Sequence, residues 1–273
     1  MSCFPQPLFI KGGAGDNFAL YLPAEGTIKG SILYVPPFAE EMNRCRHIVS
    51  RQARELARQG HACLVLDLYG TGDSAGEFSD ASWDIWKQDV KCAADWLMQK
   101  TGTNVTLWGM RLGALIAADV ANSIPQLFSR LLMWQPVIDG KLFLTQYLRL
   151  RVAFLMDNNL QPETTDSMRQ SVHAGQPIEV SGYTLANPLV ADLDNKRLTD
   201  FDKLDKTRVD WFEHVAEEGK PPSFASKRIF DHMTKLGCHL SAHTFVGPPM
   251  WQLHRRDEIP DLIAQTTALF GNE

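Results

Sequence analysis

The chain has 273 residues, of which 44% are hydrophobic and 22% charged, as expected for one large globular domain or for one domain with an insertion. Its 27 basic and 32 acidic residues give a formal net charge of −5, so no basic field argues for nucleic-acid binding. No apolar run approaches the roughly 18 residues needed to span a bilayer, and the first residues do not resemble a signal peptide. We therefore expect a cytoplasmic protein that does not span the membrane.

The cysteines and histidines predict neither a disulfide framework nor a metal site. The five cysteines are odd in number and form no Cys-x-x-Cys pair, which favours reduced thiols. Four histidines carry no ligand spacing; they are His173, His214, His232 and His243. We expect no metal.

Strand patterns and helix patterns alternate along most of the chain. The predicted strands cover residues 7–22 (as a hairpin), 31–35, 62–67, a run starting at 105, 131–139, 208–215 and 239–246. The predicted helices cover residues 46–59, 83–97, a stretch ending near 123, 223–236 and a last segment with Pro260 in its first turn. Such alternation implies right-handed βαβ units, and hence an α/β fold with a mostly parallel eight-stranded sheet and helices on both faces.

The alternation breaks between residues 140 and 205. Lys141 to Met156 reads as a strongly apolar helix, Pro177 to Leu185 as a strand, and a further helix starts near Pro188. We interpret this part as a cap insertion over the carboxyl edge of the sheet, with residues 1–139 and 206–273 forming the core. The apolar residues of the 141–156 helix surround its whole circumference, which favours a buried helix over one lying on a membrane surface.

The glycine-rich loop from Gly70 to Gly76 follows a predicted strand and resembles a dinucleotide-binding fingerprint. Its glycines at 70, 72 and 76 miss the Gly-x-Gly-x-x-Gly spacing by one residue, and no helix opens directly after it. We therefore expect no nucleotide cofactor, and no other cofactor.

From Val105 an apolar strand pattern runs into an apolar helix through Gly109-Met-Arg111-Leu-Gly113. This is the pattern of a nucleophile elbow, Gly-x-Ser-x-Gly, in which a strained turn lifts the central side chain above the sheet. Glycines at such a corner also serve packing alone, so the neighbouring motifs must support the assignment. Arg111 stands at the central position, and a permanently cationic guanidinium cannot attack a carbonyl. The pattern predicts an intact turn without its nucleophile.

Taken together, the elbow, the loop from Asp67 to Gly76 and the insertion resemble the α/β-hydrolase fold over nearly the whole chain. Four further motifs resemble the exosortase A system-associated hydrolases, a bacterial group found with protein sorting and exopolysaccharide production. They are Pro36-Pro-Phe-Ala-Glu-Glu-Met-Asn43, Leu148-Arg-Leu-Arg151, Val180-Ser-Gly-Tyr183 and Gly247-Pro-Pro-Met-Trp251. The resemblance implies hydrolysis of an ester or acyl group, without naming a substrate.

The resemblance also implies positions for the catalytic groups of a serine hydrolase. The nucleophile position is Arg111, and the histidine position is Trp251, with His254 three residues further on. The oxyanion donors would be the amides of Phe38 and Leu112. The acid candidates are Asp139, Glu217 and Glu218, and Ser74 is an alternative nucleophile.

Arg111 at a helix amino end can bind a carboxylate or phosphate, or it can pair internally with Glu40 or Glu41. Three hypotheses follow. In the first, the protein hydrolyses its substrate with an unconventional nucleophile or with water activated by Glu40, Glu41 or His254. In the second, it is a pseudoenzyme that binds a small or lipid-linked anion, and in the third it is an interaction scaffold. The sequence leaves the oligomeric state open, a homo-oligomer included.

Overall fold

The computed structural model describes residues 4–252 and 258–271, and its centre is an eight-stranded sheet with the order β1-β2-β4-β3-β5-β6-β9-β10. β2 pairs antiparallel with β1 and β4, and the other neighbouring strands are parallel. The predicted α/β fold with a mostly parallel eight-stranded sheet is confirmed. The strands are β1 (Gln6–Lys11), β2 (Asp16–Leu22), β3 (Gly30–Val35), β4 (His61–Leu66), β5 (Val105–Met110), β6 (Arg130–Trp134), β9 (Arg208–His214) and β10 (His239–Phe245).

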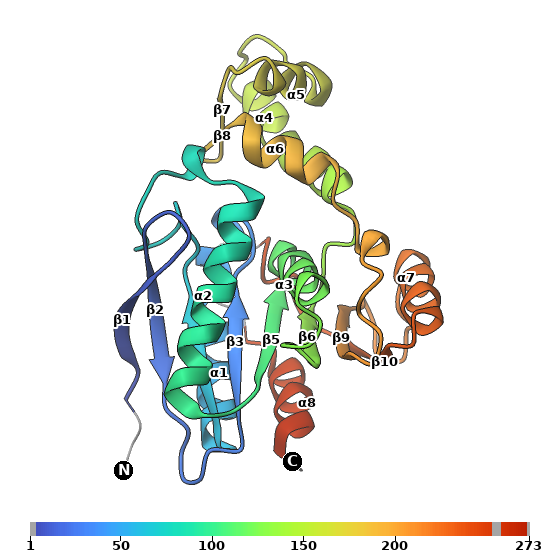
Figure 1. The fold of residues 1–273 in the computed structure, drawn as a ribbon. Coiled ribbons are helices and arrows are strands. Elements are labelled where there is room, and N and C mark those ends of the chain that lie inside the picture. The colour runs from blue at the N-terminus through green and yellow to red at the C-terminus, as the bar shows by residue number, and fades with distance from the viewer. Residues whose placement is uncertain (1–3, 253–257, 272–273) are drawn as a thin grey trace.

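Helices cover both faces of this sheet (Figure 1). One hydrophobic cluster joins the sheet to α2, α3 and α7, and a second joins it to α1 and α8. The central strands are buried along nearly their whole length, which explains their continuous apolar runs. The helices are α1 (Glu40–Arg58), α2 (Trp83–Thr101), α3 (Leu112–Ser123), α7 (Phe224–Lys235) and α8 (Pro260–Gly271), with the short 3-10 helix η1 (Phe78–Asp80).

Two boundaries near the carboxyl edge of the sheet differ from the predicted ones. α1 begins at Glu40 rather than near Arg46, because Glu40 and Glu41 occupy its first turn, where the helix dipole favours acidic side chains. β6 ends at Trp134 rather than Asp139, since Gln135 turns the chain with a φ of 43°.

Between β6 and β9 the chain forms a separate group of elements, here called the insert, residues 140–205. It consists of α4 (Gly140–Asp157), α5 (Thr165–His173), β7 (Ile178–Val180), β8 (Tyr183–Leu185), α6 (Asn187–Asp194) and the 3-10 helix η2 (Leu198–Asp200). The strand predicted over 177–185 is instead a hairpin, because the chain turns at Ser181 and Gly182 with positive φ. α5 was not predicted; its polar sequence is held by a capping box between Thr164 and Ser167.

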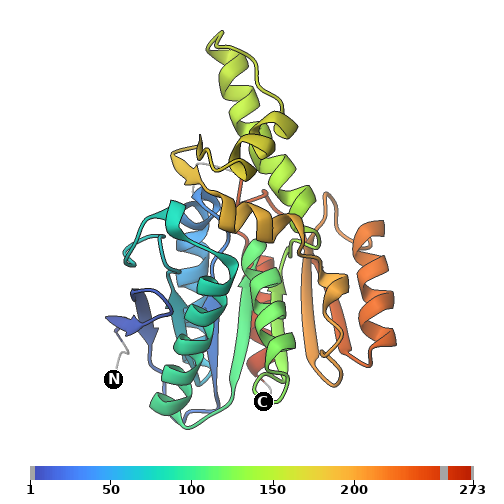
Figure 2. The ribbon, with the colours of Figure 1, turned by 45° about the horizontal axis from the view of Figure 1, so that its top comes forward.

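The expectation that the 141–156 helix is buried is wrong for one side of the helix. Phe143 and Leu148 are buried, whereas Phe154 is 57% and Met156 is 69% exposed. Figure 2 shows that α4 extends beyond the sheet and the helices that cover it. Among the described residues, no helix has the length and hydrophobicity that crossing a bilayer requires.

The insert is fastened to the core by a buried carboxylate on α3. Asp119 accepts hydrogen bonds from Lys196 of the insert at 3.0 Å and from Lys87 and the Trp83 indole of α2 at 2.7 Å each. Burial opposes the charged form, but these donors outweigh it and lower the pKa of Asp119. The pairing fixes the α6 end of the insert against α2 and α3.

Candidate functional site

The turn from β5 into α3 has the backbone geometry of an elbow. Arg111 has a φ of 53° and a ψ of −119°, a conformation that costs a non-glycine residue about 1–3 kcal/mol. Its amide donates to the Trp134 carbonyl at 3.0 Å, and its carbonyl accepts from the Val137 amide at 3.1 Å. The strained turn is thus held by the end of β6.

The two glycines that flank the turn permit close backbone approach. A Cβ on Gly113 would lie 2.2 Å from the Val35 carbonyl oxygen, and a Cβ on Gly109 would lie 2.4 Å from the Ala114 Cα. Neither position has room for a side chain, because backbone atoms cannot move aside as a flexible side chain can. The glycine spacing noted in the sequence therefore reflects contact between β3, β5 and α3.

The Arg111 side chain forms an ion pair with Glu41 of α1. Its Nε and Nη2 donate to the same Glu41 oxygen, Oε1, at 3.2 and 3.1 Å. The side chains are 15% and 10% exposed, so both charges are largely removed from water. Glu41 Oε2 is buried and has no hydrogen-bond partner among the described residues. The arginine is therefore paired through one oxygen only, rather than as a bidentate fork.

The sheet register explains why these two distant residues meet. Val35 of β3 pairs with Gly109 of β5, so the chain leaves both strands at the same edge. Burial raises the pKa of Glu41, and the Arg111 guanidinium offsets only part of this shift. Glu40 does not pair with Arg111: its Oε1 lies 3.9 Å from Arg44. Burial raises the pKa of the Tyr147 hydroxyl, and the neighbouring Glu40 carboxylate raises it further.

Two aromatic rings flank the guanidinium. The Arg111 Cζ lies 5.8 Å from the centre of the Phe143 ring in the insert and 5.1 Å from that of Trp251, within cation–π range. Trp251 follows β10, and its ring stands beside the elbow. The resemblance predicts the histidine of a serine hydrolase at this position. His254 lies outside the described residues.

Sequence reasoning missed one histidine close to this site. His214, the last residue of β9, has its ring centre 6.0 Å from that of Trp251. Its Nε2 lies 2.5 Å from the Gly247 carbonyl oxygen. The only sequence signal was its place at the carboxyl end of a strand, where catalytic groups gather in sheets of this kind.

The two proposed oxyanion residues lie at neighbouring strand ends. Leu112 is the first residue of α3, so its amide has no acceptor within the helix. Phe38 lies between β3 and α1, and its side chain is 2% exposed. Its ring packs edge-on against those of Phe78, Trp86, Phe143 and Tyr147.

The other catalytic candidates have structural partners. The Ser74 hydroxyl donates to the Asp67 carbonyl at 2.7 Å and accepts from the Phe18 amide at 2.8 Å, which ties a turn to β2. Asp139 caps α4 and pairs with Arg197 at 3.0 Å. Glu217 is 73% exposed on its own loop. These contacts place the three side chains in a turn, at a helix amino end and on an exposed loop.

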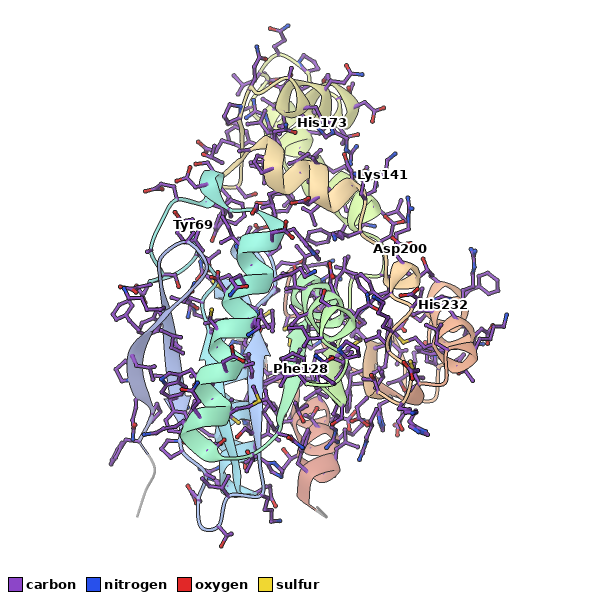
Figure 3. All side chains as sticks on the ribbon, viewed as in Figure 1. Tyr69, Phe128, Lys141, His173, Asp200 and His232 are labelled. Atoms are coloured by element: carbon purple, nitrogen blue, oxygen red, sulfur yellow. The ribbon has the colours of Figure 1, made fainter. Side chains whose placement is uncertain are left out.

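The described residues hold no group of three or more histidine, cysteine or acidic side chains arranged for a metal ion. His173 and His232 lie on separate elements, the first in the insert and the second on α7 (Figure 3). The thiols of Cys45, Cys63, Cys92 and Cys238 are free.

The strand order, the elbow turn and the helices on both faces define an α/β-hydrolase fold. The chain belongs to the serine aminopeptidase S33 family (Hydrolase_4), which matches residues 26–217. No curated protein sequence matches it.

Solved structures support the same fold at low sequence identity. Est1E from Butyrivibrio proteoclasticus with bound ferulic acid superposes with a TM-score of 0.64 at 15% identity, over 97% of this chain and 96% of that one. DcsB in complex with a substrate analogue gives 0.67 at 15%, over 98% and 99%. A thermostable carboxyl esterase from Bacillus coagulans with glycerol gives 0.62 at 13%, over 100% and 99%.

Proposed function

We propose that this chain is a pseudo-hydrolase that binds a small anion at Arg111, with Glu41 occupying the place of the anion when no ligand is bound. The observation that carries the proposal is the one-oxygen pairing of Arg111 with Glu41 at the elbow. A guanidinium has five N–H donors, and a carboxylate or phosphate can accept two of them in parallel.

The energetic argument concerns the burial of Glu41. Burial raises the pKa of this carboxyl, which means that its ionised form is poorly compensated by the surroundings. An incoming anion that pairs with Arg111 in the bidentate manner would let Glu41 become protonated or turn away. The rings of Phe143 and Trp251 would then hold the guanidinium in place.

The proposal extends to the insert and to the biological setting. Phe143 belongs to the insert, which supports residues 140–205 as a cap over an anion site in a core made of 1–139 and 206–273. The resemblance to exosortase-associated hydrolases supports a small or lipid-linked anionic ligand from exopolysaccharide production or protein sorting. A cytoplasmic location and a homo-oligomer belong to the same proposal.

Calorimetric titration with phenyl phosphate and benzenesulfonate tests the anion site. We expect binding by the wild-type protein, loss of binding in Arg111→Ala, and binding about tenfold or more tighter in Glu41→Gln, because an internal competitor has been neutralised. Glu55→Gln, on the exposed face of the same helix, is the matched control. Absence of binding in both the wild type and Glu41→Gln, or binding indifferent to Arg111→Ala, would overturn the proposal.

A second candidate is an interaction scaffold in which the ion pair only fills the former active site. The low exposure of Arg111 and Glu41 favours it, since a closed pair admits no ligand without rearrangement. Under this candidate Glu41→Gln lowers stability and creates no anion binding. The same titration therefore separates the two functions.

A further inference from the structure

A cavity of about 220 Å³ lies between α1 and the sheet, away from the Arg111 side chain. Phe18 and Leu20 of β2 form one wall, and Met42 and Val49 of α1 form the wall opposite. Val65 and Leu66 of β4 contribute as well, and most of the lining is apolar. Met42 follows Glu41 directly, so this cavity and the elbow site share the first turn of α1 but use different side chains.

The polar lining of the cavity consists of the Arg46–Asp67 ion pair and the hydroxyls of Tyr34 and Ser50. Arg46 is 40% exposed; its Nη2 donates to Asp67 at 2.9 Å and its Nε to Asn43 at 3.4 Å. Asp67 is 3% exposed, and its Oδ2 accepts from both Arg46 and the Asp73 amide, so this oxygen is already occupied, while Arg46 has further N–H groups to donate. The Ser50 hydroxyl lies on the same helix and also lines the cavity. A ligand at this end should therefore offer acceptor oxygens.

We propose that this cavity binds a short-chain or single-ring carboxylic acid, with the apolar part between α1 and β2 and the carboxylate toward Arg46. The size supports this choice, because a dry apolar cavity of about 150 Å³ is enough to hold benzene. The charge supports it too, because an arginine that already bonds one carboxylate through a single nitrogen has further N–H groups for a second.

Titration with 3-phenylpropionate tests the site, and saturation-transfer NMR and calorimetry detect the binding. Toluene is the matched probe that lacks a carboxylate. We expect both to bind the wild-type protein. Arg46→Gln should weaken the binding of 3-phenylpropionate about tenfold or more and leave toluene binding unchanged, because toluene carries no carboxylate that could pair with the guanidinium. Ser50→Phe, at a partly exposed lining position, should block both probes. Toluene binding by Arg46→Gln also shows that this variant is folded.

Arg54→Gln, an exposed arginine of the same helix, is the matched control and should bind as the wild type does. In an Arg111→Ala background, which lacks the proposed anion site, 3-phenylpropionate should still bind and Arg46→Gln should still weaken this binding, which separates the two sites. Failure of both probes to bind, or binding that neither Arg46→Gln nor Ser50→Phe alters, would overturn the inference.

Discussion

Ala39 and Arg111 have nearly the same backbone conformation, with a φ of 53° at both and ψ values of −128° and −119°. Each stands between a strand and a helix, and the two strands are neighbours in the sheet. The amino ends of α1 and α3 therefore lie close together, and the charge of Arg111 adds to the partial positive charges of the two helix dipoles. The acidic first turn of α1 is the electrostatic counterpart of this arrangement.

The wild-type protein should not react with a serine-directed fluorophosphonate, and Arg111→Ser alone should react poorly. The resemblance predicts the general base at Trp251, which lies beside Arg111, and His214 Nε2 lies against the Gly247 carbonyl. Adding Trp251→His to Arg111→Ser should speed labelling about 100-fold, the usual contribution of a general base. Gel fluorescence measures the rate, with Arg111→Ala/Trp251→His as control. Labelling of any serine in the wild type would contradict this account of the site.

Removing one member of the ion pair should cost more stability than removing both. Arg111→Met leaves Glu41 buried without its cation, which should lower the free energy of unfolding by about 3–5 kcal/mol. Arg111→Met/Glu41→Gln should recover about 1 kcal/mol or more of this loss. Urea denaturation of the wild type, both single variants and the double variant measures the coupling. Strictly additive costs would show that the two side chains do not interact.

The stability difference between the wild type and Glu41→Gln should depend on pH. Because burial raises the pKa of Glu41, the folded state binds more protons than the unfolded state between the two pKa values. The contribution of Glu41 is therefore most favourable below its unfolded pKa and is lost as the pH rises through its folded pKa. As the pH falls from about 7 to about 5, we expect the free energy of unfolding of the wild type to increase relative to that of Glu41→Gln. An opposite slope would mean that Arg111 outweighs burial.

Gly113→Ala should destabilise the fold by about 1–3 kcal/mol or more, because its new methyl group would meet the backbone carbonyls of Val35 and Pro36. Gly271→Ala is the control, since a Cβ there would lie 3.4 Å from the nearest side-chain atom, an ordinary contact. Its effect should stay within about 0.5 kcal/mol. Thermal unfolding of both variants compares the costs, and equal costs would refute the close approach of α3 to β3.

The aromatic composition of the site could be predicted only in part. The glycines on either side of Arg111 marked the turn because they are neighbours in the sequence, and Trp251 was placed through the resemblance. Phe143 and His214 were not expected at the site. Phe143 lies in the insert and His214 at the end of β9. Local sequence patterns do not indicate which strand ends become neighbours in the folded sheet.

The sequence by itself determined the alternation of strands and helices, the elbow turn and the absence of a serine at its centre, because periodicity and turn chemistry are local properties. Only the tertiary structure decided that Glu41 rather than Glu40 pairs with Arg111, and that Phe154 and Met156 of α4 are exposed. The first depends on which face of α1 is turned toward β5. The second depends on whether another element covers the helix, and apolar residues spread around a helix do not contain that information.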